Sequence, residues 1–317
     1  MEFAALTCPQ CGGSLPRQAR WRMVICPYCN NNVTRSDSIV EAALFHKAWL
    51  DSQAAVKSSG RIINISGKSF RIIMPLGGGD TSEVYLAERL SILPERVIIK
   101  LAKEGTRPGV LTDEFKILQE LQALKSSGSA YFSQRLPQAV FSGKTGDTLR
   151  EALVLREPAG FWGSLEDVSK NYPHGIDPRH AIWMWRRVLE VLGYIHDNGW
   201  SHGELHPGHM LVHPADHGIL IICWRKAQKI SKNKESRIRD LQGAAWSIRS
   251  MLSGDSDEPG FGNKTPAPLI ELLQKASEND GLCSSLGAAG IDEELKSAAV
   301  KIYGPPSFVP FYPVPHK

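Results

Sequence analysis

Two similar Cys-x-x-Cys pairs near the N-terminus constrain this chain more than any other feature. They read Cys-Pro-Gln-Cys at residues 8–11 and Cys-Pro-Tyr-Cys at residues 26–29. Four thiolates in this pattern are typical of a tetrahedral zinc site, and a segment of about 30 residues needs such a cross-link because its own core is too small. We therefore expect residues 1–35 to form a zinc ribbon, with a short hairpin between the pairs that carries Trp21 and Val24. The expected zinc ligands are Cys8, Cys11, Cys26 and Cys29.

The cysteine pattern and the N-terminal residues predict a cytoplasmic protein. Paired cysteines of this kind bind metal in a reducing compartment, whereas secreted chains use them for disulfides. Residues 1–8 contain no basic segment followed by an apolar one, and no stretch of about 18 apolar residues occurs later. The net charge of +4 is too small to predict a nucleic-acid-binding surface over the whole chain. Neither a membrane nor a nucleic acid is an expected partner.

Beyond the ribbon, the hydrophobic pattern predicts a mixed α and β chain. Apolar periodicity over residues 36–60 predicts a linking helix that ends at Ser58-Ser59-Gly60. From Ile62 onward, strand-like runs cover residues 69–74, 84–87, 97–101 and 153–155. Helical spacing appears over residues 111–124 and 182–196. A proline-rich tail occupies residues 305–317.

Two motifs in the strand-rich part resemble a known family. Gly77-x-Gly79-x-x-Ser82-x-Val84, followed by Val-Ile-Ile-Lys ending at Lys100, is similar to the glycine-rich loop and third-strand lysine of protein kinases. The resemblance implies that the loop's backbone N–H groups cover the phosphates of a nucleotide while Lys100 supplies positive charge to them.

The resemblance continues through the rest of the chain. Glu114, rather than Glu120, matches the helix glutamate that pairs with the lysine. Residues 194–212 follow the helix and catalytic loop of the family, residues 219–225 occupy the place of the strand before the metal-binding Asp-Phe-Gly motif, and Asp240 looks like the start of the next conserved helix. Residues 61–304 are thus expected to form a bilobal protein-kinase-like domain of the α+β class, with a β-rich N-lobe and a helical C-lobe.

The residues that would hold magnesium are replaced. Cys223 stands where the family has the metal-binding aspartate, and His209 stands where it has the catalytic-loop asparagine. Magnesium takes oxygen ligands, so we do not expect it to bind in the usual way. In the catalytic loop, Glu204 replaces the catalytic aspartate and Gly203 replaces an arginine, while His202 matches a residue that supports the loop. These changes predict a pseudokinase.

Two further differences point the same way. Ile98 replaces a small alanine above the adenine ring, where three extra carbons would crowd the nucleotide. The segment between Arg225 and Asp240 is short and lacks an Ala-Pro-Glu motif. The His-Gly-x-Leu-x-Pro-x-His form of the loop, together with the ribbon, is similar to bacterial kinase-like proteins.

The leading interpretation is a regulatory or scaffolding module with a protein partner, structural zinc, and weak ATP binding that depends little on magnesium. One alternative is an atypical active Ser/Thr protein kinase that uses Glu204 as its base and retains Lys100 and Glu114. Another is a nucleic-acid-associated protein that makes contact through Arg17, Arg20 and Arg22 of the ribbon, although a solvated basic face explains these residues more simply.

Two other features leave alternatives open. Five histidines close to Cys223 invite a transition-metal site, but Pro207 and Pro214 argue against one continuous helix, and hydrogen-bonded structural histidines are the simpler interpretation. These histidines are His202, His206, His209, His213 and His217. The tail interleaves prolines with Phe308, Phe311 and Tyr312, and it could bind a partner or dock on the chain's own C-lobe.

Overall fold

The computed structural model describes residues 60–92, 94–230, 235–254 and 260–315, together with two short strands near the N-terminus. These strands, β1 (Met23–Ile25) and β2 (Asn32–Thr34), pair in antiparallel fashion with Val24 opposite Val33. The partner of Val24 thus follows the second cysteine pair, while Trp21 and the rest of the hairpin expected between Cys11 and Cys26 lie outside the described residues. The four cysteines and the linking helix expected over residues 36–60 lie outside the described residues, apart from Gly60.

The chain divides into two compact units. The first extends to Lys116 and includes Gln138–Gly160, and the second contains Ile117–Pro137 and Phe161–Lys317. The first unit is built mainly from strands and the second mainly from helices. This separation of strands from helices agrees with the α+β class expected from the sequence. Helix α2 (Val110–Gln122) crosses the boundary between the units.

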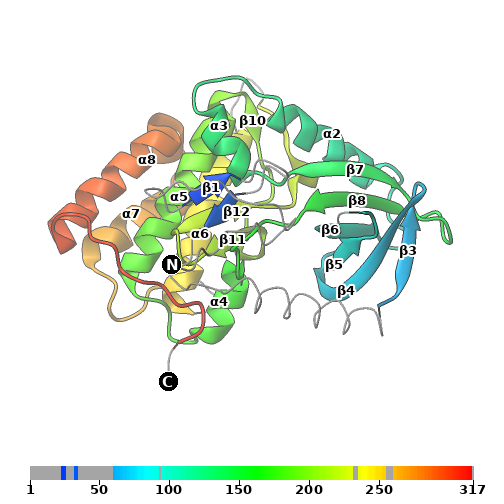
Figure 1. Cartoon of the computed structure of the whole chain (residues 1–317). Coiled ribbons are helices and arrows are strands. Elements are labelled where there is room, and N and C mark those ends of the chain that lie inside the picture. The colour runs from blue at the N-terminus through cyan, green and yellow to red at the C-terminus, as the bar shows by residue number, and fades with distance from the viewer. Residues whose placement is uncertain are drawn as a thin grey trace. The chain divides into compact units, whose positions relative to one another are not determined.

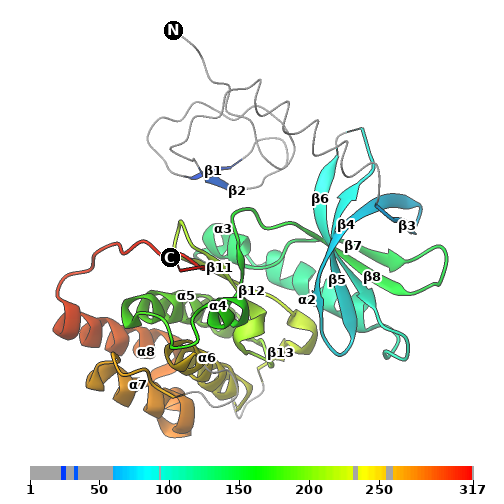
Figure 2. The same ribbon diagram turned by 90° about the horizontal axis from the view of Figure 1, so that it is seen from below.

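Six antiparallel strands make up the sheet of the first unit, in the order β3-β4-β5-β6-β8-β7. They are β3 (Ile62–Ile65), β4 (Lys68–Gly78), β5 (Ser82–Arg89), β6 (Glu95–Ala102), β7 (Ala139–Lys144) and β8 (Glu151–Arg156). Figures 1 and 2 show these strands curling around one another. The two edge strands meet, because Ile65 bridges Thr145 and the Ser66 N–H donates to the Lys144 carbonyl over 3.0 Å. Closing the sheet in this way removes an exposed strand edge.

Alternation along β6 separates a core face from the opposite face. Val97, Ile99 and Leu101 are buried in the closed sheet, whereas Ile98 and Lys100 point to the other side. The core cluster on the inner side draws on five strands. Its members are Ile63, Ile65, Phe70, Ala87, Val97, Ile99, Leu101, Ala152 and Val154.

Long helix α5 (Pro178–Asp197) lies at the centre of the second unit and packs against α6 (Glu235–Ser253) and α8 (Asp280–Tyr303). Its start is explained locally: the Asp177 side chain accepts a hydrogen bond from the Arg179 N–H, and proline occupies the first helical position. The helix predicted over residues 182–196 is confirmed and extends in both directions. Around it lie α3 (Ser129–Phe132), α4 (Leu165–Asn171) and α7 (Ala267–Glu278).

Short strands position the loops of this unit. Strands β9 (Gly163–Ser164), β11 (Met210–His213) and β12 (Gly218–Ile221) form one sheet, and β10 (Trp200–Ser201) pairs with β13 (Gln228–Lys229). The first described residue of helix α6 is Glu235, which precedes Asp240, so the expectation that the helix starts at Asp240 is wrong. Asp240 lies inside the helix and is buried. Among the described residues, no helix is both long enough and apolar enough to cross a membrane.

Candidate functional site

In the first unit, the sheet and α2 bring Lys100 and Glu114 together. Lys100 Nζ lies 2.5 Å from Glu114 Oε2, and the two side chains are only 6% and 1% exposed. Glu120, the other glutamate of this helix, lies 3.5 Å from Lys229 and is exposed. Removal of one partner from a buried pair leaves an uncompensated charge, which is strongly destabilising. The Lys100–Glu114 pair is therefore important for the stability of the first unit.

The glycine-rich segment forms a tight turn between β4 and β5. The Gly79 N–H donates to the Ser82 carbonyl over 3.0 Å, and Gly77 has a φ of +146°, which favours glycine. Gly77 and Gly79 are exposed, while Ser82 is buried at the start of β5, two residues before Val84. Asp80 at the tip of the turn adds an exposed negative charge. Its carboxylate would repel a phosphate group placed at the turn.

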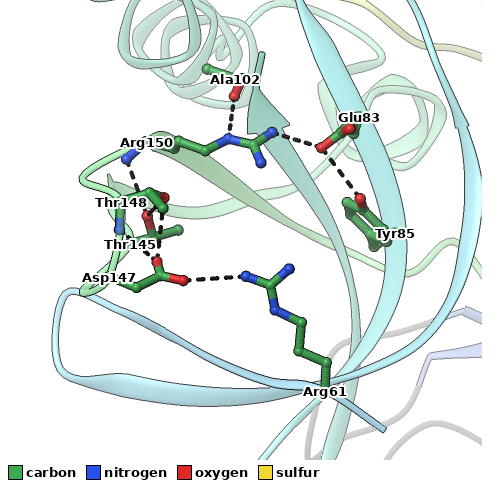
Figure 3. A network of polar contacts seen from close by, with 8 residues as sticks. All are labelled: Arg61, Glu83, Tyr85, Ala102, Thr145, Asp147, Thr148 and Arg150. Carbon is green, nitrogen blue, oxygen red and sulfur yellow. Dashed lines mark hydrogen bonds and ion pairs between the residues drawn. The ribbon is translucent and has the colours of Figure 1, made fainter. Parts of the chain in front are cut away.

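Figure 3 shows a polar network that holds the second arm of this turn. Arg150 Nη2 lies 2.6 Å from Glu83 Oε2, and Arg150 Nε donates to the Ala102 carbonyl over 2.6 Å. The hydrogen bond from Arg150 is the main reason that the pKa of Glu83 lies below its ordinary value. Through these contacts one side chain joins β5 to the end of β6. Sequence reasoning missed this network, because Arg150 lies far from Glu83 and Ala102 along the chain.

The position of Ile98 follows from the strand register. Ile98 is half-buried on the same face as Lys100, opposite Leu86 on β5 and Leu155 on β8. Lys100 in turn lies opposite Val84 and Leu153. Branched or long aliphatic side chains therefore surround the lysine on this face.

Asp240 anchors the loop of the second unit that resembles a kinase catalytic loop and contains His202, Gly203 and Glu204. Its carboxylate accepts hydrogen bonds from the His202 N–H over 2.7 Å and from the Gly203 N–H over 2.8 Å. His196 Nε2 lies 3.0 Å from the same carboxylate, and both side chains are almost completely buried. The loop backbone is thereby fixed to helix α6.

The ring of His202 supports the loop. Its Nε2 lies 2.9 Å from the Ile222 carbonyl, which can only accept, so this nitrogen carries the proton. The unprotonated Nδ1 then accepts from the Glu204 N–H over 3.4 Å. Trp224 packs edge-on against the same ring with centroids 4.8 Å apart. These contacts connect β12, the following turn and the loop.

Both carboxylate oxygens of Glu204 lie within ion-pair distance of a basic side chain, although Oε2 accepts no hydrogen bond from a described residue. Arg225 Nη2 lies 2.7 Å from Oε2, and Lys226 Nζ lies 2.6 Å from Oε1. Burial raises the pKa of Glu204, but the hydrogen bond from Lys226 and the charge of Arg225 outweigh it, so the pKa lies below its ordinary value. Glu204 is thus an ionised carboxylate that is already neutralised by two cations.

A local turn brings these cations to Glu204. Cys223 adopts a left-handed conformation with φ 65° and ψ 59°, and Trp224–Lys226 follow as a single 3-10 turn, η3. Trp224 is completely buried, and its Nε1 donates to the Ile221 carbonyl over 2.8 Å. Sequence reasoning missed the pairing of Arg225 and Lys226 with Glu204. Two consecutive basic residues directly after Trp224 were the available signal.

His209 is held in a neutral form. Its Nδ1 lies 2.7 Å from the Glu204 carbonyl and donates to it, and its ring contacts that of His206 with centroids 3.7 Å apart. Burial first, and then the charge of His206, lower the pKa of His209 to about 3.

The cluster of five histidines does not form one metal site. His213 Nδ1 accepts from the Asp216 N–H over 3.2 Å, and His217 stacks on Trp183 with centroids 4.3 Å apart. In the described parts of the chain, no group of three or more His, Cys, Asp or Glu side chains could hold a metal ion. The transition-metal alternative is therefore not supported, because short turns direct these rings to different neighbours.

Comparison with known proteins agrees with this arrangement. Residues 101–258 match the model of the lipopolysaccharide kinase (Kdo/WaaP) family. A serine/threonine-protein kinase of Myxococcus xanthus, pkn2, is 31% identical over 150 residues, which are 47% of this chain. The structure of vaccinia related kinase 3 superposes with a TM-score of 0.57 and 16% identity, covering 80% of this chain and 95% of that one. The chain has a protein-kinase-like fold.

The matches differ in what they cover. The similarity to the Myxococcus xanthus kinase spans 16% of that protein's length. The match to the Kdo/WaaP family begins at Leu101 and therefore includes Glu114 and the Glu204 loop, but neither the glycine-rich turn nor Lys100. The similarity is thus to kinases of more than one kind.

Proposed function

We propose that this protein is a catalytically impaired kinase-fold module that acts by binding a protein partner in a regulatory or scaffolding role. The observation that carries the proposal is the pairing of Glu204 with Arg225 and Lys226. A general base must be basic enough to take up the proton of the substrate hydroxyl, and these two cations lower the pKa of Glu204. A carboxylate held by two cations is a poor proton acceptor at neutral pH.

The replacement of both magnesium ligands supports the same proposal. His209 presents an imidazole that is committed to the Glu204 carbonyl, and Cys223 presents a thiol within a tight turn. Phosphoryl transfer depends on magnesium to neutralise the developing charge, and magnesium prefers oxygen ligands. We propose weak ATP binding through Lys100 and the glycine-rich turn, with little dependence on magnesium.

The test is incorporation of labelled γ-phosphate into a general peptide substrate and into the protein itself. We expect transfer at least some hundredfold below that of a typical kinase. The variant Cys223→Asp/His209→Asn should gain magnesium-dependent nucleotide binding without phosphoryl transfer. Adding Arg225→Ala and Lys226→Ala to this variant removes both cations from the Glu204 carboxylate. Strong magnesium-dependent transfer by the unmodified protein would contradict the proposal.

The alternative function is an atypical active kinase. The buried Lys100–Glu114 pair favours it, as do relatives whose names are those of kinases. In this reading Glu204 acts as base after Arg225 and Lys226 move away. Transfer that is present in the unmodified protein and lost in Glu204→Gln would support this alternative.

A further inference from the structure

The proline-rich tail, residues 305–315, lies against the helical unit. The chain leaves α8 after Tyr303 and turns at Gly304, which has a φ of +78°. Figure 1 shows the tail in red, crossing α5 toward α4. Phe311 is the one buried side chain among residues 305–315, at 4% exposure. Its ring contacts those of Tyr172, His180 and Trp183.

A second ring of the tail continues an aromatic stack. Phe308 stacks on His217 with centroids 4.2 Å apart and an interplanar angle of 17°. His217 stacks in turn on Trp183, at 4.3 Å and 5°. The imidazole is therefore sandwiched between one ring of α5 and one ring of the tail. Two phenylalanines three positions apart thus enter one aromatic surface.

Hydrogen-bond donors from the end of α4 meet the backbone of the tail. The Tyr172 hydroxyl donates to the Tyr312 carbonyl, and Asn171 Nδ2 donates to the Pro313 carbonyl over 3.2 Å. Aromatic grooves with donors directed at backbone carbonyls are the usual means of recognising proline-rich peptides. We call this surface the tail groove and define it by Asn171, Tyr172, His180, Trp183 and His217.

The contacts of the tail suit a ligand that can leave. Phe308, Tyr312 and Val314 remain 59%, 51% and 52% exposed in the docked tail. One buried ring and a few surface contacts oppose the conformational entropy of a whole segment, so docking and release are closely balanced. The first tail residues, 305–307, are exposed and connect the docked part of the tail to Gly304 and α8.

We propose that the tail groove is a binding site for a proline-rich segment of a partner protein, and that residues 308–313 occupy it as a displaceable internal ligand. The partner segment carries two aromatic side chains three positions apart, followed by proline, as the tail does at Phe308, Phe311 and Pro313. This inference deepens the proposed binding role and rests on it for the existence of a partner. It does not depend on phosphoryl transfer.

The test uses a fluorescent peptide with the sequence of residues 305–315 and the full-length protein. The variant Phe308→Ala/Phe311→Ala leaves the groove intact but disables the internal ligand. We expect this variant to bind the peptide at least about tenfold more tightly than the unmodified protein, because a tethered ligand competes at high effective concentration. The full-length variant Val314→Ala is the matched control and should behave like the unmodified protein, because this tail side chain is 52% exposed and lies outside residues 308–313.

Two further measurements make the result decisive. In the Phe308→Ala/Phe311→Ala background, Tyr172→Phe removes one hydroxyl without changing the shape of the groove, and it should weaken peptide binding several-fold. A peptide with both phenylalanines replaced by alanine should not bind. Absence of peptide binding by the double variant, with a native circular-dichroism spectrum, would overturn the proposal, as would a tail-dependent dimer of the unmodified protein. Peptide binding together with strong phosphoryl transfer would refute only the proposed loss of catalysis.

Discussion

At the scale of single residues, Gly203 stands where the resemblance to kinases places an arginine, and the structure explains why. Its φ is +82°, and a Cβ built on it would lie 2.6 Å from the Lys226 carbonyl oxygen. The loop and the turn that carries the cations of Glu204 therefore approach so closely that only glycine fits. The same approach places Lys226 beside Glu204.

We expect Gly203→Ala to lower the free energy of unfolding by about 3 kcal/mol, since it combines a left-handed alanine with a backbone clash. Gly199→Ala is the matched control, because Gly199 has a similar φ of +76° and open space around its Cβ position. The control should cost only about 1 kcal/mol. Urea unfolding of both variants measures the difference, and equal losses would show that the contact with Lys226 is unimportant.

His217 predicts how tail docking depends on pH. Its pKa is lowered to about 4, first by burial and then by the charge of His180, with Arg187 acting in the same direction and Asp216 and the Val309 backbone opposing them. A released tail would expose the ring, and its pKa would return toward about 6.5. Docking therefore favours the neutral ring: it is strongest above pH of about 6.5 and weakens as the pH falls toward 4.

Peptide binding by the Phe308→Ala/Phe311→Ala variant should accordingly be several-fold weaker at pH 5 than at pH 7.5. Most of this dependence should disappear when His217→Phe is added, because phenylalanine keeps the stack without a proton site. The pKa of His180, which contacts Phe311, is also lowered by burial and accounts for any remainder. A pH dependence unchanged by His217→Phe would show that another group is responsible.

At the scale of elements, the contact between β6 and α2 depends on a buried ion pair. Lys100→Met should lower the free energy of unfolding by about 3 to 5 kcal/mol, because it removes the buried cation that lies 2.5 Å from the Glu114 carboxylate. Lys100→Met with Glu114→Leu should recover much of this loss. Arg61→Ala, which breaks the exposed pair with Asp147, should cost no more than about 1 kcal/mol. Equal losses of unfolding free energy for Lys100→Met and Arg61→Ala would show that the buried pair stabilises the protein no more than an exposed one.

Zinc binding by the N-terminal cysteines remains a prediction, since these cysteines lie outside the described residues. We expect one zinc ion per chain, held by Cys8, Cys11, Cys26 and Cys29. Cys11→Ser should abolish metal retention and unfold the ribbon, whereas Cys223→Ser, which changes a cysteine far along the chain, should retain zinc. Elemental analysis of the purified proteins decides the matter, and a zinc-free unmodified protein would refute the ribbon.

At the scale of the whole molecule, nucleotide affinity depends on opposing features. Lys100 and the backbone N–H groups of the turn at Gly77–Ser82 favour an anion, whereas the Asp80 carboxylate repels it. Ile98 also occupies space that the resemblance assigns to adenine, and overpacking costs about 1 to 3 kcal/mol. Ile98→Ala should therefore tighten ATP binding about tenfold or more in thermal-shift titrations. Ile62→Ala, at an exposed position of the same sheet, should leave affinity unchanged. No gain from Ile98→Ala would show that this side chain does not limit binding.

The sequence by itself indicated the class of fold, through the resemblance to kinases, and marked six elements: β4, β5, β6, β8, α2 and α5. The almost fully apolar run at residues 97–101 marked β6, and apolar residues at helical spacing over residues 182–196 marked α5. The resemblance also picked out Lys100, Glu114, His202 and Glu204. These signals are local, so they can be read from neighbouring residues.

Only the tertiary structure decided how these residues are used. The closure of the sheet by Ile65 and Thr145, the anchoring of the loop by Asp240 and the docking of Phe311 all join segments that are distant in sequence. Glu204 illustrates the limit best: its residue type fits a base, but its partners, Arg225 and Lys226, are set by the left-handed turn at Cys223. Backbone conformation and long-range packing select such contacts, and the order of residue types along the chain does not specify them.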